Sequence, residues 1–182
     1  MAKTSLSHPL LITSVPAGAK RGRVGLTFCP GKYDPHALTG SWERNLALDL
    51  DAVRDWGAAA VVTLLQPYEL KLLRVDRLGE EVTRRGMAWL HLPIADGGVP
   101  DQAFELQWRV AGAGLRTLLA GGCDVLIHCR GGLGRTGTVG ARLLAELGRE
   151  PRAAIALVRK ARPGAIENAA QETYVLAVRP AA

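Results

Sequence analysis

The chain has 182 residues, 48% of them hydrophobic and 22% charged, which is typical of one soluble globular domain and excludes a disordered or fibrous chain. No apolar run approaches the roughly 18–20 residues that cross a bilayer, so we expect no membrane partner. The formal net charge of +6 favours anionic partners, but the bases are scattered and only 5% of residues are aromatic, so we expect no nucleic-acid partner.

Residues 1–21 are predicted to form a surface tail, and residues 22–182 to form the domain. The apolar part of the tail, PLLITSV, is short and bounded by Ser and Pro, unlike the longer apolar core of an export signal. Four short apolar runs then predict strands. These runs are residues 22–28, 60–65, 88–92 and 124–128.

Helical spacing of apolar residues predicts six helical segments between and after these strands. They are residues 42–58 after a Ser41 cap, 67–86, 102–120 with Asp101 as cap, 137–148, 151–162 and 168–178. Because strands alternate with helices, we expect an α/β fold, a single domain with a mostly parallel central sheet flanked by helices.

Two loops are expected to meet at one edge of this sheet. Ligands of parallel sheets sit beyond the carboxyl ends of the strands. The loop at 93–100, rich in Pro and Gly, and the loop at 129–136 both leave strands at that end.

Cysteine usage bears on the cellular compartment. The chain has three cysteines, Cys29, Cys123 and Cys129, and no CxxC pair. An odd number without pairs argues against a disulfide framework or a zinc site, so no metal is expected. A cytoplasmic location fits these thiols. The richness in Ala, Gly and Arg favours a bacterial source, and we expect a monomer.

The segment HCRGGLGRTG, residues 128–137, joins a predicted strand to a predicted helix and is compatible with three site types. Gly132, Gly134 and Gly137 match the GxGxxG fingerprint of dinucleotide enzymes. That fingerprint requires an acid about 20 residues later on a further strand, where this chain has only helices, and it gives Cys129 no role. The nucleoside triphosphatase loop is excluded because no Lys follows Gly137.

The third interpretation, a site for a phosphate ester, uses every residue of the loop. Five residues separate Cys129 from Arg135, and a loop of this length can point its N–H groups at a tetrahedral oxyanion. The Arg135 guanidinium can hold two phosphate oxygens, and the positive field favours a nucleophilic thiolate at Cys129. The predicted phosphate-binding residues are Arg130, Gly131, Gly132, Leu133, Gly134 and Arg135.

The neighbours of this loop have supporting roles in the same interpretation. His128 is expected to hold the loop through hydrogen bonds rather than to accept a proton. Thr136 can place a hydroxyl near the sulfur and help the thiolate to leave. The alternative for Cys129 is an inert buried thiol beside a glycine turn.

These residues resemble the signature loop of cysteine-dependent protein tyrosine and dual-specificity phosphatases. The resemblance extends to the branch of the cyclin-dependent kinase-associated phosphatase, through LPIADGGVPD (92–101), Cys29-Pro30-Gly31 and GAIENAAQETY (164–174). It covers roughly residues 22–178. It implies the protein tyrosine phosphatase-like fold and a two-step reaction through a cysteinyl-phosphate, without a cofactor.

The resemblance also implies roles for two further residues. Asp96 would be the general acid that protonates the leaving oxygen and later activates water, in a loop that can close. Asp101 is the rival, although it is placed to cap a helix. Gln171 resembles a water-positioning glutamine, and its alternative is the polar face of the last helix.

The expected substrate is a phosphorylated protein, carrying phosphotyrosine and also phosphoserine or phosphothreonine. One alternative is an inositol lipid or another small phosphate ester, although the loop has Arg130 and no lysines. Another is an inactive module that binds phosphopeptides. Such relatives usually lose the Cys, Arg or Asp that this chain has at Cys129, Arg135 and Asp96.

Overall fold

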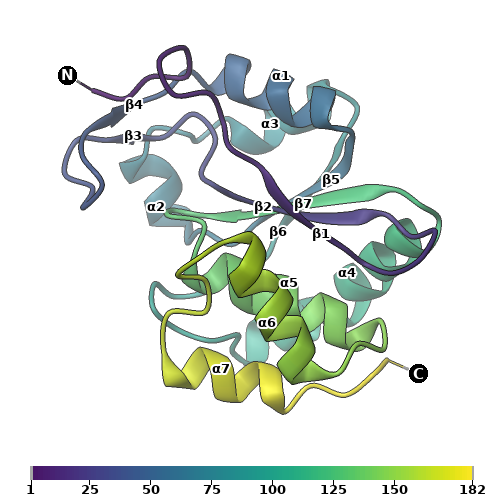
Figure 1. Cartoon of the computed structure of the whole chain (residues 1–182). Coiled ribbons are helices and arrows are strands. Elements are labelled where there is room, and N and C mark those ends of the chain that lie inside the picture. The colour runs from purple at the N-terminus through teal and green to yellow at the C-terminus, as the bar shows by residue number, and fades with distance from the viewer. Residues whose placement is uncertain (1, 182) are drawn as a thin grey trace.

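A five-stranded sheet separates two groups of helices in the computed structural model, which describes residues 2–181 (Figure 1). The strand order is β1-β2-β7-β5-β6, and all neighbours are parallel except β1 and β2. The strands are β1 Thr13–Pro16, β2 Arg23–Phe28, β5 Ala58–Thr63, β6 Ala88–His91 and β7 Asp124–Cys129. The expected α/β fold with a mostly parallel sheet is confirmed.

The two faces of the sheet bury separate hydrophobic clusters. Because side chains alternate along a strand, Val125 and Ile127 of β7 face one cluster while Leu126 faces the other. The first face is covered by α4 Gln102–Ala120, α5 Gly134–Glu146, α6 Pro151–Ala161 and α7 Ala169–Leu176. The second face is covered by α1 Leu46–Trp56, α2 Pro67–Leu72 and α3 Leu78–Arg84 (Figure 1).

The N-terminal segment differs from the expected surface tail. Residues 13–16 form β1, the antiparallel edge strand, in which Val15 pairs with Val24 and is almost fully buried. Upstream, the Ser5 hydroxyl accepts a hydrogen bond from the Asn45 N–H at 2.9 Å. The segment PLLITSV was considered only as an export signal and assigned to the tail, but its last residues form a strand because the open edge of β2 offers them partners.

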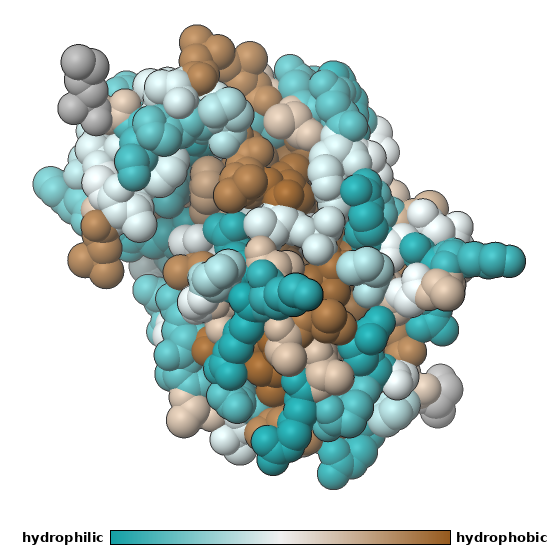
Figure 2. All heavy atoms as spheres, in the orientation of Figure 1, coloured by the Kyte–Doolittle hydropathy of each residue, from teal (hydrophilic) through white to brown (hydrophobic). Residues whose placement is uncertain are grey.

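Apolar side chains gather on one face of the molecule where this segment crosses the sheet (Figure 2). Leu10 and Ile12 are partly buried against the second cluster, while Leu11 between them is 62% exposed. This alternation follows from extended backbone, which points successive side chains to opposite sides.

The first helix begins later than predicted. Asn45, not Ser41, is its N-cap, and its side chain accepts from the Leu48 N–H at 3.0 Å. The preceding residues instead form a small hairpin of β3 Tyr33–Asp34 and β4 Trp42–Glu43. Asn is as good a cap as Ser, so the tertiary pairing of β4 decided between them.

Two other helical predictions need correction, and the predicted cap of α4 is confirmed. The segment at 67–86 is two helices, because the chain turns at Arg74 with a φ of +57° and buries Val75. Helix α5 begins at Gly134 rather than at residue 137. Asp101 caps α4 as predicted, accepting from the Phe104 N–H at 2.8 Å.

Candidate active site

The glycine loop turns directly from the end of β7 into α5. The Cys129 sulfur lies at its start, almost fully buried, and accepts a hydrogen bond from the Gly132 N–H at 3.2 Å. Gly132 has a φ of +72°, and a Cβ there would lie 2.4 Å from the Thr27 carbonyl oxygen. Only glycine fits this position. The backbone can therefore turn here and direct the Gly132 N–H toward the Cys129 sulfur.

A buried arginine supports the outer side of the loop. Arg162, just after α6, donates to the carbonyl oxygens of Gly131, at 3.3 Å, and Gly132. Burial lowers the pKa of Arg162, and the nearby Cys129 opposes this shift. By holding these carbonyls outward, Arg162 leaves the loop N–H groups free to face inward. The sequence analysis missed this residue, because no local pattern links it to the loop.

The predicted phosphate-gripping arginine is fixed by a carboxylate that the sequence analysis also missed. Arg135 makes two hydrogen bonds to the Glu69 carboxylate, at 2.6 and 2.9 Å, and both side chains are nearly buried. Hydrogen bonding to Glu69 raises the pKa of Arg135 against the effect of burial, so the charge is kept. Glu69 also caps α2 through the Gln66 N–H, which was its only local sequence signal.

The structure brings Asp96 to the loop and leaves Asp101 away from it. One Asp96 oxygen lies 2.8 Å from Arg135 Nη2, and its side chain is 65% exposed. The Ile94 carbonyl accepts from the same guanidinium at 3.0 Å. The two loops expected to meet therefore do so, while Asp101 is occupied as the cap of α4.

His128 lies beneath the loop and is completely buried. Its Nε2 is 2.8 Å from the Thr63 hydroxyl, which accepts from the Trp89 indole N–H at 2.9 Å. Its Nδ1 is 3.4 Å from the Cys129 carbonyl oxygen. Burial, aided by the charge of Arg135, lowers the pKa of His128 to about 4. A neutral, fully engaged imidazole suits the expected role of holding the loop.

This low value predicts a pH-dependent stability. The unfolded chain binds a proton at the imidazole near the usual pKa of 6.5, whereas the folded chain does so only near 4. The contribution of His128 is therefore complete above pH 6.5 and is lost as the pH falls toward 4, by about 3 kcal/mol. Urea unfolding of wild type and His128→Asn across this range should show the difference between them shrinking. Parallel pH curves would contradict it.

Thr136 and Gln171 are both buried, and their expected roles stay predictions. The Thr136 hydroxyl has no hydrogen-bond partner among residues 2–181, so it makes no hydrogen bond to the Cys129 sulfur. The Gln171 side chain is hydrogen-bonded to protein groups at both ends, to the Glu167 N–H and the Gly98 carbonyl. Its role as a water-positioning residue stays a prediction.

The loop opens into a cavity of about 360 Å³ with charged groups on its walls. Arg130 points away from the sulfur and is held by Asp34 through two hydrogen bonds of 2.8 and 2.9 Å. Lys32 is nearly buried beside it and donates to the Arg130 carbonyl at 3.3 Å. Burial lowers the pKa of Lys32, opposed by the charge of Asp34. The site thus contains a lysine that the loop sequence lacks.

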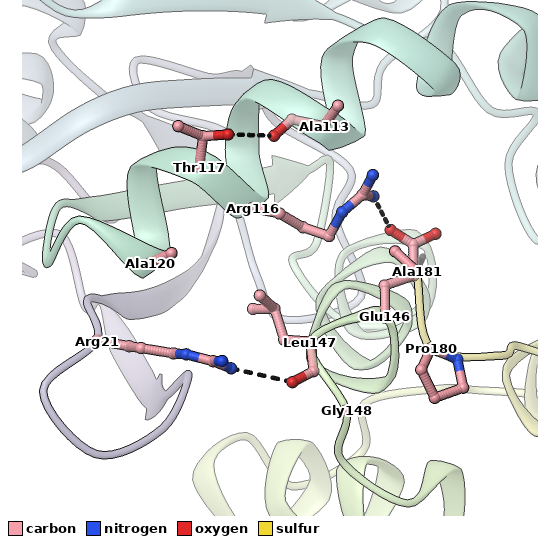
Figure 3. A pocket seen from close by; sticks show the side chains of 10 residues that line it. All are labelled: Arg21, Ala113, Arg116, Thr117, Ala120, Glu146, Leu147, Gly148, Pro180 and Ala181. Atoms are coloured by element: carbon pink, nitrogen blue, oxygen red, sulfur yellow. Dashed lines mark hydrogen bonds and ion pairs between the residues drawn. The ribbon is translucent and has the colours of Figure 1, made fainter.

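A second hollow, of about 480 Å³, lies at the far end of α5 (Figure 3). Its walls carry Arg21, which donates to the Leu147 carbonyl at 2.9 Å, and Arg116, which pairs with Glu146. Because α5 is about 18 Å long, this hollow is remote from Cys129. Its arginines already have protein partners, and it holds no cysteine or histidine. We therefore assign the chemistry to the loop cavity.

Comparison with known families agrees with this site. Residues 34–175 match the model of the Swiss Army Knife protein DSP-PTPase phosphatase domain. The chain belongs to this family of DSP-PTPase phosphatase domains. Among the described residues, no helix is long and apolar enough to cross a membrane.

Individual relatives place the chain within the family. Human cyclin-dependent kinase inhibitor 3 is 35% identical over 135 residues, which is 72% of this chain and 62% of that protein. The match thus spans less than two thirds of the curated relatives, which are mammalian and give no support to a bacterial source.

Solved structures give the same placement. The kinase-associated phosphatase, with its catalytic cysteine replaced by serine, is 30% identical, covers 92% of both chains and has a TM-score of 0.79. The active form of Tk-PTP is 32% identical over 86% of this chain and 90% of its own, with a TM-score of 0.65. The expected resemblance and fold are confirmed.

Proposed function

We propose that the protein is a cysteine-dependent protein phosphatase that hydrolyses phosphotyrosine and also phosphoserine or phosphothreonine. The observation that carries this proposal is the convergence of three groups on one cavity. The Cys129 sulfur accepts the Gly132 N–H at 3.2 Å, Arg135 lies 2.8 Å from Asp96, and all three side chains line the same cavity.

In the first step, the Cys129 thiolate attacks phosphorus and the bond to the leaving oxygen breaks. The loop N–H groups and the Arg135 guanidinium take up the charge on the phosphoryl oxygens. Protonated Asp96 gives its proton to the leaving oxygen, which departs as an alcohol or phenol. The products are a cysteinyl-phosphate and an Asp96 carboxylate.

In the second step, the Asp96 carboxylate takes a proton from water as the water oxygen attacks phosphorus. The sulfur–phosphorus bond breaks, inorganic phosphate leaves and the thiolate returns. The buried Thr136 hydroxyl has no hydrogen-bond partner among residues 2–181, so it is free to donate to the departing sulfur if it turns toward it. No metal or cofactor takes part in this scheme.

A second substrate class is favoured by the basic side of the cavity. Lys32, His36 and Arg130 line it together with Cys129. Such a set could receive a second anionic group, as in an inositol lipid or another small phosphate ester. Asp34 already neutralises Arg130, however, so the protein substrate remains our first choice.

The test is phosphate release by the wild-type chain, with a chelator present, from phosphotyrosine and phosphothreonine peptides and from inositol phosphates. We expect turnover of the phosphotyrosine peptide, and slower turnover of the phosphothreonine peptide. Turnover of inositol phosphates alone would favour the second class. Tight binding of a phosphopeptide without turnover of any substrate would indicate an inactive binding module.

A further inference from the structure

Two side-chain amides tie the loop that carries Asp96 to the start of α7. Asn168 Nδ2 donates to the Gly97 carbonyl at 2.9 Å, and Gln171 Nε2 donates to the Gly98 carbonyl at 3.2 Å. These two carbonyls belong to the residues that directly follow Asp96. The contacts join segments that are more than 70 residues apart in the chain.

Both amides are anchored at their other end at the start of α7. Asn168 is the N-cap residue of the helix, and its side-chain oxygen Oδ1 accepts a hydrogen bond from the Gln171 N–H at 3.0 Å. The side-chain oxygen Oε1 of Gln171 accepts a hydrogen bond from the Glu167 N–H at 2.9 Å, and the Gln171 side chain is fully buried. Each side chain thus connects a fixed helix end to the loop, with little freedom to take another rotamer.

The same helix end also rests on the phosphate loop. A Cβ built on Gly134 would lie 2.8 Å from Gln171 Nε2 and 2.1 Å from a Glu167 carboxylate oxygen. Gly134 lacks that atom, and so the α7 end can approach the first turn of α5. Gln171 therefore touches both loops that the reaction has to bring together.

Few other interactions fix the conformation of the loop that carries Asp96. Gly97 has a φ of +68°, and a Cβ there would meet nothing within 4 Å. Within the loop, the Gly98 N–H donates to the Ala95 carbonyl at 2.9 Å, which forms a turn around Asp96. Among residues 2–181, the two amides and the ion pair with Arg135 are the side-chain hydrogen bonds and ion pairs that attach this turn to the domain.

We propose that Asn168 and Gln171 are positioning residues that hold the Asp96 loop closed over Cys129. The inference rests on the proposed function and deepens it. It gives Gln171 a different task from the water-positioning role predicted from sequence, because both ends of its amide are engaged with backbone groups in the closed site. It also assigns a role to Asn168, which the sequence analysis did not single out.

The two roles predict different dependence on the leaving group. A displaced Asp96 slows the first step only where the leaving oxygen needs a proton. A lost water-positioning group slows hydrolysis of the cysteinyl-phosphate, which is the same intermediate for every substrate. Aryl phosphates of rising leaving-group basicity, from p-nitrophenyl to phenyl phosphate, therefore separate the two roles.

The variants are Asn168→Asp and Gln171→Glu. Each variant keeps the side-chain oxygen that accepts a hydrogen bond at the start of α7. Each replaces the NH₂ group that donates to the Asp96 loop by a second oxygen, which cannot donate. We expect kcat/KM for phenyl phosphate to fall about 10- to 100-fold, and that for p-nitrophenyl phosphate less than about threefold. Thr173→Ala, an exposed position on the same helix, is the matched control and should change neither value.

An equal loss of kcat on all substrates with kcat/KM unchanged, or a burst of product followed by slow turnover, would overturn the proposal. Hydrogen exchange of the backbone amides of residues 97–99 tests the attachment of the loop without relying on a measurement of catalysis. It should speed up about tenfold in Asn168→Asp relative to wild type, and unchanged exchange would also overturn the proposal. If wild type hydrolyses no phosphate ester but exchange changes as expected, the proposed function fails while the loop attachment stands.

Discussion

Replacing Cys129 by serine is expected to reduce phosphate release by at least about five orders of magnitude. A serine hydroxyl stays protonated near neutral pH and is a poor nucleophile for phosphorus. Its oxygen can still accept the Gly132 N–H that the sulfur accepts at 3.2 Å. The loop should therefore keep its shape.

The measurement is steady-state release from a phosphotyrosine peptide, alongside calorimetric binding of the same peptide. Binding should persist in Cys129→Ser, because the N–H groups and Arg135 remain. Cys123→Ser is the control, since this thiol is exposed at the start of β7, at the opposite end of the strand. A Cys129→Ser variant that keeps a tenth of wild-type activity would rule out the thiolate mechanism.

Replacing Arg135 by lysine is expected to lower kcat/KM by about 10²–10⁴-fold. Lysine keeps the positive charge but loses the planar pair of donors. Arg135 uses that fork to bind both Glu69 oxygens and still presents Nη2 toward Asp96 at 2.8 Å. The single nitrogen of lysine cannot hydrogen-bond to the Glu69 carboxylate and to two phosphate oxygens at the same time with good geometry.

The loss should appear in kcat as well as in KM, because the guanidinium acts most strongly on the charge of the transition state. Thermal unfolding should show a moderate decrease, since Glu69 keeps a cationic partner in its buried site. Arg152→Lys, an exposed position on α6, serves as the control. If Arg135→Lys retained the wild-type kcat, the assignment of Arg135 to the transition state would be wrong.

The predicted elements show where local sequence is sufficient. The strands at β5, β6 and β7 were recognisable because each is a short apolar run with turn residues at its ends. The Asp101 cap was recognisable because side chain and helix are adjacent in sequence. Strand β1 was not, because its apolar residues become a strand only when β2 offers an open edge.

The candidate site divides in the same way. Cys129, the glycines and Arg135 could be predicted together, since a loop of six residues closes through its own backbone angles. Glu69, Arg162 and Asn168 could not, because they reach the site from other elements. The choice of Asp96 over Asp101 came from a family resemblance and stays a prediction, and Asp96 forms an ion pair with Arg135 at 2.8 Å.

The sequence by itself determined the strand–loop–helix unit that holds Cys129 and Arg135, because short-range spacing and glycine freedom specify it locally. Only the tertiary structure decided what surrounds that unit. Glu69 is 66 residues from Arg135, and Asn168 is 71 residues from Gly97. Contacts over such separations depend on how helices pack against the sheet, and no periodic pattern in one sequence encodes which side chains then meet.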